Sequence, residues 1–267
     1  MQEQHLIPSQ VNHVCLFILH LANNSLSHST IRTYLSAISF VHKLHSADDP
    51  TSAFMVAKTL QGIKNLHGPS TNQRLPITKD ILHDFLHSLP YAVPNRIELI
   101  TWNAIFLFTF HACLRAGEVT LSRNPMNVIR ISQLKLNDDH FTIQFQQYKH
   151  SKGRMPLVTV TKQPHGTPCP VSSLRAYINT RGYTSGQLFL NPDKSPITIQ
   201  QFSNTLRNTV AISNLPTARY TTHSFRLGKA TQMAMDGQPD QVIRSAGRWR
   251  STAYTTYLRP DHITLPN

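Results

Sequence analysis

The chain has 267 residues, enough for one large domain or for a small and a larger one, each with its own core. Its 26 lysines and arginines against 13 acidic residues give a net charge of +13, which favours a polyanion as partner and predicts salt-dependent binding. Three widely separated cysteines without a CxxC spacing argue against a disulfide framework or a zinc finger, and the most apolar run is too short to cross a bilayer, so we expect an intracellular protein that makes no membrane contact.

Apolar residues at helical spacing predict three helices in the first seventy residues. The first covers residues 11–21, the second residues 28–44 and the third about residues 52–66. The third carries Lys58 and Lys64 on its polar side. We therefore predict a small helical domain, residues 1–66, with a basic face.

A stretch of Gly, Pro, Ser and Asn without periodicity follows, residues 67–76. Such a composition is typical of an exposed linker between domains. We expect a second, larger domain over residues 77–267.

In the second domain, Thr78 is expected to cap a short helix ending near Leu89, and a longer helix is predicted from about 95 to 113. Between residues 128 and 160 the pattern alternates, which predicts two strands around a turn at 151–153 that carries Lys149 and Lys152. Helical segments then return at 172–180, 197–213, 223–237, 239–247 and 251–259. The fold class is therefore mainly α with a small antiparallel β-sheet.

Several basic and aromatic residues stand at helix ends. Arg115 follows an apolar helix and has Glu118 three residues on, a spacing that by itself suits a structural ion pair. His223 and Arg226 fall three apart at a helix start, where the helix dipole attracts anions, although such a pair is equally an exposed polar turn. Gly237 fits a left-handed helix stop, and Trp249 follows the next helix. All of these side chains could converge on one anion.

The order of these features resembles the tyrosine recombinase (integrase) family: an Arg with Glu three residues later, a hairpin lysine, His-x-x-Arg at a helix start, Gly-Arg-Trp, and a tyrosine near the end. KHSK in the hairpin and GRW are most similar to the eukaryotic mobile-element branch of Crypton- and DIRS-type recombinases. The resemblance implies a helical, SAM-like core-binding domain followed by an integrase/type IB topoisomerase-like catalytic domain.

The resemblance also implies roles for individual residues. Arg115, His223 and Arg226 would bind the scissile phosphate of double-stranded DNA. Trp249 would occupy the second His/Trp position, and Tyr257 would be the nucleophile. Lys149 or Lys152 would be the general acid, and the spacing to the proline that opens the second strand suits Lys149 better. Glu118 would orient the neighbouring arginine. No metal or cofactor is implied, and four protomers would act on two DNA sites.

Other basic residues are expected to contact the phosphate backbone of DNA or to be solvated charges. On the N-terminal domain and the predicted hairpin and C-terminal helices these are Lys43, Lys58, Lys64, Arg154, Arg244, Arg248 and Arg250.

Three alternatives remain at this point. Asp138 and Asp139 resemble a two-metal pair, yet they fall in an NDD turn between strands. His83 and His87 have the i, i+4 spacing of two zinc ligands, but no third ligand is evident nearby and a polar helix face explains them. The chain could also be a DNA-binding regulator that has lost catalysis, against which stands the full set of catalytic residue types.

The last segment contains two tyrosines, and a helix capped by Ser251 would place Tyr254 and Tyr257 about 60° apart. Tyr254 is four residues before Leu258, which suggests core packing. Tyr257 lies eight residues after Trp249, near the nine usual in bacterial members of the family. We therefore expect Tyr257 to be the nucleophile and Tyr254 to support it.

Overall fold

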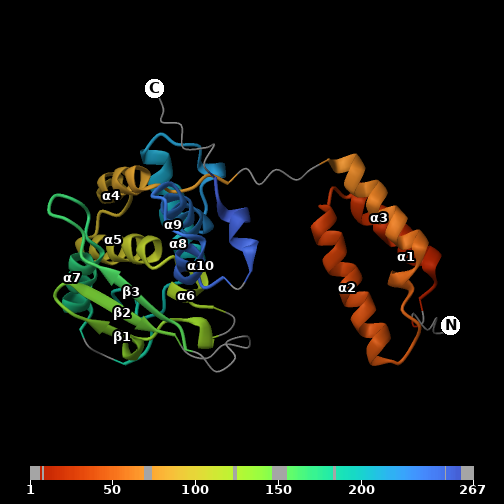
Figure 1. Ribbon diagram of the computed structural model, residues 1–267, viewed down its shortest axis with the longest axis horizontal. Helices are drawn as coiled ribbons and strands as arrows, with labels where there is room; N and C mark the ends of the chain where they lie inside the picture. Colours follow the sequence, from red (N-terminus) through yellow and green to blue (C-terminus); the bar gives the residue numbers. More distant parts are fainter. Residues whose placement is uncertain are drawn as a thin grey trace. The chain divides into compact units, whose positions relative to one another are not determined.

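The computed structural model describes residues 7, 9–68, 74–122, 125–145, 155–182, 185–249 and 251–259 (Figure 1). The chain forms two compact units, Met1–Asn72 and Gln73–Asn267. The division falls within the stretch that the sequence suggests as a linker. No helix in the described parts of the chain has the length and apolar character needed to span a membrane.

The first unit consists of three helices around a small apolar core. These are α1 (Val11–Asn23), α2 (His28–Leu44) and α3 (Phe54–His67), with a 3-10 turn, η1 (Pro50–Ser52), before the last. The Ser27 side chain accepts a hydrogen bond from the Thr30 amide, which satisfies one free N–H at the start of α2. Core residues recur at helical spacing, which is why the three helices were predictable; they are Val14, Ile18, Leu21, Ile31, Leu35, Val56 and Ile63.

The second unit begins before the end of the expected linker. The backbone N–H of Leu75 donates to the carbonyl of Arg219 (2.8 Å), and that of Ile77 donates to the carbonyl of Ser224 (3.0 Å). Residue 228 faces this strap, and a Cβ there would lie 1.7 Å from the Ile77 carbonyl oxygen, so only Gly228 permits the approach. Residues 75–77 thus belong to the packed unit, and the predicted linker end at residue 76 is too late.

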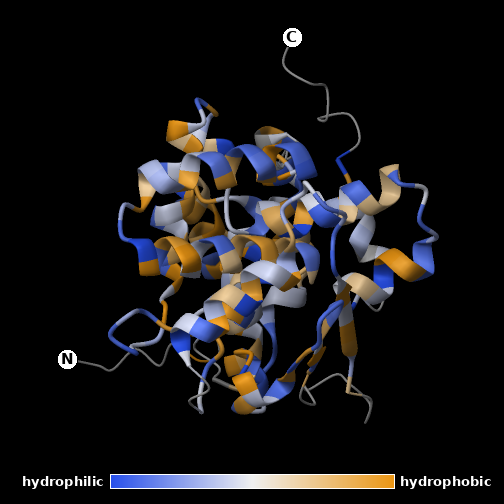
Figure 2. Ribbon diagram, turned by 90° about the vertical axis from the view of Figure 1, so that its left-hand side faces the viewer, coloured by the Kyte–Doolittle hydropathy of each residue, from blue (hydrophilic) through white to orange (hydrophobic). Residues whose placement is uncertain are grey.

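The helices of the second unit surround one apolar helix, α5 (Arg96–His111). Every residue from Thr101 to Phe110 except Asn103 is buried. A helix that is apolar on every side is stable only when other elements cover it. It packs against α4 (Lys79–Ala92), α7 (Pro170–Arg181) and α9 (His223–Met235), while α8 (Ile199–Ile212) packs against α4. Many of the other helices carry both orange and blue stretches in Figure 2, as expected where one side of a helix is buried.

Three strands form the only sheet within the described residues, in the order β1-β2-β3 and with antiparallel pairing. They are β1 (Leu134–Leu136), β2 (His140–Gln144) and β3 (Leu157–Thr161). Phe141 and Ile143 face the core, and α7 packs against β3 (Figure 1). The pairing reaches Gln144 and Leu157, and the Phe145 amide donates to the Pro156 carbonyl, so the two strands of the predicted hairpin are confirmed.

Short elements complete the site-bearing side of the unit. They are α6 (Ala116–Val119), α10 (Asp240–Gly247) and the 3-10 segments η2 (Pro125–Asn127), η3 (Ile131–Gln133), η4 (Thr217–Arg219) and η5 (Thr252–Tyr257). Gly237 has a φ of 69°, which confirms the predicted left-handed stop after α9. The fold class expected from the sequence, mainly α with a small antiparallel sheet, is confirmed.

The last element differs from the prediction, because η5 is a 3-10 helix and not an α-helix. With about three residues per turn, residues i and i+3 lie on the same side. Tyr254 and Tyr257 therefore lie one above the other on one side of η5, and the expected offset of about 60° between them is wrong. Both rings lie beside Trp249, at centroid distances of 6.2 and 5.2 Å.

Candidate active site

A cavity of about 570 Å³ opens in the second unit, where α6, η2, η3, the end of β2 and the starts of α8 and α9 meet. Its charged and titratable lining residues are Arg115, Glu118, His223 and Arg248. Two cationic arginines against one carboxylate leave the lining with excess positive charge. Such a hollow is suited to an anion.

Arg115 reaches this cavity because the chain turns sharply after α5. Cys113, which is buried, adopts a left-handed backbone with a φ of 50°, and two residues later Arg115 is the N-cap residue of α6. The Glu118 carboxylate accepts a hydrogen bond from the Arg115 amide (2.7 Å), and the Arg115 guanidinium lies 3.5 Å from the same carboxylate. The Arg115 side chain remains 48% exposed, so its guanidinium is available to a ligand.

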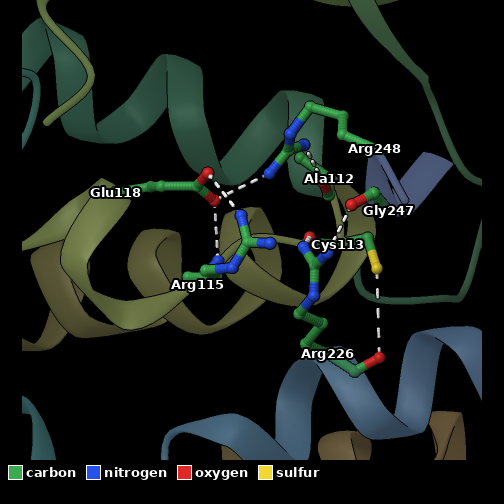
Figure 3. Close-up of polar contacts among 7 residues, drawn as sticks. All are labelled: Ala112, Cys113, Arg115, Glu118, Arg226, Gly247 and Arg248. Carbon is green, nitrogen blue, oxygen red and sulfur yellow. Dashed lines mark hydrogen bonds and ion pairs between the residues drawn. The ribbon is translucent and has the colours of Figure 1, made fainter. Parts of the chain in front are cut away.

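Glu118 has a second and closer cationic partner in Arg248. One guanidinium nitrogen of Arg248 donates to the Glu118 carboxylate at 2.7 Å, and Figure 3 shows Glu118 between the two arginines. The sequence suggested that Arg248 is a surface phosphate contact or a solvated charge. The structure differs, because the Arg248 side chain is only 5% exposed and lies over the ring of Phe145 at 4.2 Å.

Arg226 lies next to this group and is fully buried. Its guanidinium donates to the Cys113 carbonyl (2.6 Å) and to the Gly247 carbonyl, as drawn in Figure 3. Its Nε has no hydrogen-bond partner among the described residues. Burial lowers the pKa of Arg226, and the nearby positive charges of Arg115 and Arg248 lower it further. Within the described parts of the chain, carbonyl oxygens and aromatic rings hold this cation, and no carboxylate forms an ion pair with it.

Trp249 and Tyr257 cover the Arg226 guanidinium. The guanidinium carbon lies 4.2 Å from the centre of the Trp249 ring and 5.7 Å from that of Tyr257, both within the range of cation–π attraction. Residue 247 must be glycine here, because a Cβ would lie 1.7 Å from the Trp249 ring. The Trp249 indole nitrogen is buried without a hydrogen-bond partner among the described residues, so the side chain acts by packing.

The two tyrosines differ in exposure and in partners. Tyr254 is buried with Ala230, Met233 and Ile243, which agrees with the expectation that it packs in a core. A hydrogen bond to the Asp240 carboxylate raises the pKa of Tyr254. Tyr257 is half-buried, and its carbonyl accepts a hydrogen bond from the Thr231 hydroxyl at 3.3 Å.

His223 lies in the first turn of α9 and is exposed at the cavity. The Thr222 side chain makes no capping bond at the start of α9, and the Ser224 hydroxyl accepts a hydrogen bond from the Thr221 amide. Burial of the ring lowers the pKa of His223, and the positive charges of Arg74, Arg226 and Arg115 lower it further. These effects favour the neutral imidazole, which can donate one hydrogen bond and accept another.

The predicted hairpin turn lies outside the described residues, and with it Lys149, Lys152 and Arg154. Arg250 also lies outside them. The described strands bring both ends of that turn to Phe145 and Met155, and Phe145 lines the cavity.

The remaining candidate DNA contacts among the described residues are not lining residues of the cavity. Lys43 is 70% exposed with Asp49 at 3.7 Å, Lys58 lies 5.2 Å from the Phe54 ring centre, and Lys64 is exposed. These three belong to the first unit. Arg244 is half-buried in the last turn of α10.

The alternative metal sites gain no further ligand. The rings of His83 and His87 face one another with 3.3 Å between nitrogens, as the i, i+4 spacing predicts. Asp138 pairs with Arg175, and Asp139 with His140, in the turn between β1 and β2. Within the described ranges, no three His, Cys, Asp or Glu side chains gather as a metal site would require.

Sequence reasoning missed Phe145, and it assigned Arg248 to the DNA backbone and not to the cavity. One signal for Arg248 was present, because it lies nine residues before Tyr257 (257 − 248), the interval expected from bacterial members of the family between the second His/Trp residue and the tyrosine. Trp249, to which that position was given, does not line the cavity, whereas Arg248 does. Phe145 had no local signal, since its contact with Arg248 joins residues more than a hundred positions apart.

Comparison with known proteins gives a consistent result. A model of the "Phage integrase family" matches residues 79–261. The Tn1549 transposon integrase in complex with circular intermediate DNA is 15% identical, with a TM-score of 0.64 over 94% of this chain and 81% of that chain. A lambda integrase dimer bound to a COC′ core site is 12% identical, with a TM-score of 0.65 over 98% and 68% of the two chains.

The XerH site-specific recombinase bound to its difH substrate is also similar, at 13% identity and a TM-score of 0.61 over 94% of this chain and 67% of that one. At such low identities these likenesses establish the fold alone. Comparison with curated proteins finds no match.

Proposed function

Because this chain belongs to the phage integrase family, we propose that it is a site-specific DNA recombinase that cuts and rejoins strands through a covalent bond to Tyr257. One observation carries the proposal. The buried Arg226 guanidinium contacts both the Cys113 carbonyl, in the loop that presents Arg115, and the ring of Tyr257. A candidate nucleophile and two candidate phosphate ligands, far apart in sequence, thus share one neighbourhood.

The chemistry explains why arginines suit such a site. Attack on a phosphodiester passes through a pentacoordinate phosphorus whose non-bridging oxygens carry additional negative charge. Arg115 and Arg226 would stabilise that charge with permanently charged, bidentate donors, which lysine cannot match in geometry. His223, in its neutral form, would donate a further hydrogen bond to the same oxygens or assist proton transfer.

The proposed cleavage step balances without a cofactor. The Tyr257 hydroxyl oxygen attacks phosphorus and passes its proton to the imidazole of His223, the phosphorus bond to the 5′-oxygen breaks, and a 3′-phosphotyrosyl link forms. A hairpin lysine, Lys149 in our first assignment and Lys152 as the alternative, gives a proton to the departing 5′-oxygen. The bond energy is retained, so a 5′-hydroxyl from another strand can reverse the step.

The partner in this proposal is double-stranded DNA, in keeping with the net charge of +13. The similar structures are DNA complexes of a transposon integrase, lambda integrase and a site-specific recombinase. We extend this to a homotetramer acting on two DNA sites in the integration or excision of a mobile element. The KHSK and GRW motifs support a place in the Crypton- and DIRS-type branch, and then an action in the nucleus.

A second function, a DNA-binding regulator without catalysis, is favoured by one observation. Two guanidinium nitrogens of Arg226 donate to backbone carbonyls, and aromatic rings cover the group. These bonds use two of the five N–H donors of the guanidinium. If the remaining donors contact no phosphate, Arg226 serves the fold alone.

Incubation with nicked duplexes separates the two functions. A nick close to the cleavage position lets the short 5′-terminated strand diffuse away, which traps the covalent adduct for detection on a denaturing gel. Since the target site is unknown, fragmented genomic DNA is the starting substrate, and sequencing of the attached ends identifies the site. We expect an adduct from the native chain and from Tyr254→Phe, and none from Tyr257→Phe. Adduct from Tyr257→Phe but not from Tyr254→Phe would overturn the assignment.

A further inference from the structure

The ion pair between Glu118 and Arg248 is closer and more deeply buried than the pair between Glu118 and Arg115. The Arg248 contact is 2.7 Å long with a side chain 5% exposed, whereas the Arg115 contact is 3.5 Å long with a side chain 48% exposed. Glu118 itself is 12% exposed. Charge attraction weakens with distance and with contact to water, so Arg248 takes the larger share of the Glu118 charge.

Arg248 is fixed independently of Glu118. It caps the C-terminal end of α10 with a left-handed backbone (φ 56°). Its guanidinium lies over the Phe145 ring at 4.2 Å and reaches toward the Ala112 carbonyl at 3.4 Å. The contacts come from the residue that follows β2 and from the turn after α5, so the position of Arg248 does not depend on one weak contact.

These contacts hold the two arginines of the cavity wall in different ways. Arg248 is buried, oriented by neighbours and close to the carboxylate, while Arg115 is held mainly through its backbone amide. If Glu118 had Arg115 as its sole cationic partner, the two would form a tight i, i+3 pair. The charge of Arg115 would then be compensated within the protein and less available to an anion in the cavity.

We propose that Arg248 is a positioning residue for Arg115: by binding Glu118, it keeps this carboxylate from neutralising the guanidinium that faces the cavity. The inference rests on the proposed function in one respect, that Arg115 is a phosphate ligand. It gives Arg248 a role other than direct contact with DNA. It also explains why a carboxylate, which repels phosphate, is tolerated in the lining of the cavity.

The test is a charge-removal cycle in the full-length chain. Arg248→Met keeps an apolar side chain over Phe145 but frees Glu118 to pair with Arg115, and we expect phosphate affinity to fall about tenfold to a hundredfold, the range for loss of one charge-assisted contact. Adding Glu118→Gln to Arg248→Met removes the competing negative charge. The phosphate affinity of the double variant should therefore be at least about tenfold higher than that of Arg248→Met alone. Arg248→Lys keeps a cation, so its phosphate affinity should lie between those of the native chain and Arg248→Met.

Inorganic phosphate is the probe, and its affinity is measured from the rise in melting temperature on titration. The double variant leaves no unpaired buried charge, so it keeps the test open if Arg248→Met folds poorly. In an Arg115→Gln background, Arg248→Met should have little further effect on phosphate affinity, which is the matched control. A double variant that binds phosphate as weakly as Arg248→Met, or more weakly, would overturn the proposal and make Arg248 a direct ligand or a purely structural residue.

A failure of the proposed recombinase function can be distinguished from a failure of the role proposed for Arg248. Adduct formation by the native chain tests the recombinase assignment, and the phosphate cycle needs no catalysis. Recovery in the cycle together with no adduct on any DNA would leave Arg248 as the positioning residue of a non-catalytic phosphate site. An adduct together with no recovery would retain the recombinase and reject the role of Arg248.

Discussion

The two phosphate-binding candidates, Arg115 and Arg226, are held by different kinds of partner. Arg115 lies at an open cavity beside a carboxylate that it shares with Arg248. Arg226 is fully buried, bonded to two backbone carbonyls and covered by the rings of Trp249 and Tyr257. Carbonyls and rings are dipoles and quadrupoles, so they orient a cation without cancelling its charge.

This difference indicates that the two arginines tolerate change in their surroundings to different extents. The Arg115 side of the site can adapt, since its charge is regulated by a shared carboxylate and its side chain is half exposed. The Arg226 side is rigid, because each of its partners is itself packed. We therefore expect substitutions around Arg226 to have larger effects than substitutions around the cavity.

The largest effect is expected for Arg226→Lys. A lysine cannot contact both carbonyls and a phosphate with one planar group, and loss of one preorganised donor to a transition state costs about a hundredfold to a thousandfold in rate. Single-turnover adduct formation measures this loss. Arg115→Lys is the matched variant, and a greater loss for Arg115→Lys than for Arg226→Lys would reverse the comparison.

Gly247→Ala is expected to come next, through stability. The added methyl group would lie 1.7 Å from the Trp249 ring, so the ring must move away from Arg226. Overpacking of this kind costs about 1–3 kcal/mol in free energy of unfolding, which denaturant titration measures. Gly62→Ala in α3, where no atom lies within 4 Å of the new Cβ, is the control and should be neutral or slightly stabilising. Equal effects of the two substitutions would contradict the packing assigned to Trp249.

A smaller effect is expected for Trp249→Phe. The indole nitrogen has no hydrogen-bond partner among the described residues, so a phenyl ring preserves the kind of contact with Arg226 and loses part of its strength. Cation–π contacts contribute about 0.5–2 kcal/mol, with tryptophan the strongest. Adduct rates and melting temperatures should both fall modestly for Trp249→Phe and clearly more for Trp249→Ala. A Trp249→Phe enzyme as impaired as Trp249→Ala would instead assign a chemical role to the indole N–H.

The smallest effect is expected for the pH dependence of stability, through His223 at the cavity. Burial and neighbouring arginines lower the pKa of His223 in the folded chain below its unfolded value of about 6.5. The unfolded state therefore binds this proton more readily, and stability falls as pH decreases below about 6.5. His223→Gln should flatten the pH dependence of the unfolding free energy between about pH 5 and 7. An unchanged slope would mean that His223 is not held in its neutral form.

Local patterns predict much of this fold and only part of its site. Helix α2 matches its predicted range to the residue, because Ser27 caps it and apolar residues repeat at helical spacing. The strands β2 and β3 followed from alternation, and the stop at Gly237 from its residue type. Each of these features depends on a few neighbouring residues, which a sequence displays directly.

Two of the failures involve contacts between distant segments. The pairing of Arg248 with Glu118 joins positions 130 residues apart, and the bond from Arg226 to the Cys113 carbonyl joins positions 113 apart. The 3-10 form of η5 accompanies the packing of both tyrosines against Trp249, where the helical pattern alone suggested an α-helix. In η5, tertiary packing outweighs the local preference for an α-helix.

The central claim is that Tyr257, beside the buried Arg226, becomes covalently attached to DNA. Mass spectrometry of the protease-digested, nuclease-trimmed adduct tests it most directly, because the C-terminal peptide contains both tyrosines and fragmentation separates them. The account predicts a nucleotide 3′-phosphate on Tyr257 with Tyr254 unmodified. A nucleotide on Tyr254, or on a residue outside this segment, would contradict it.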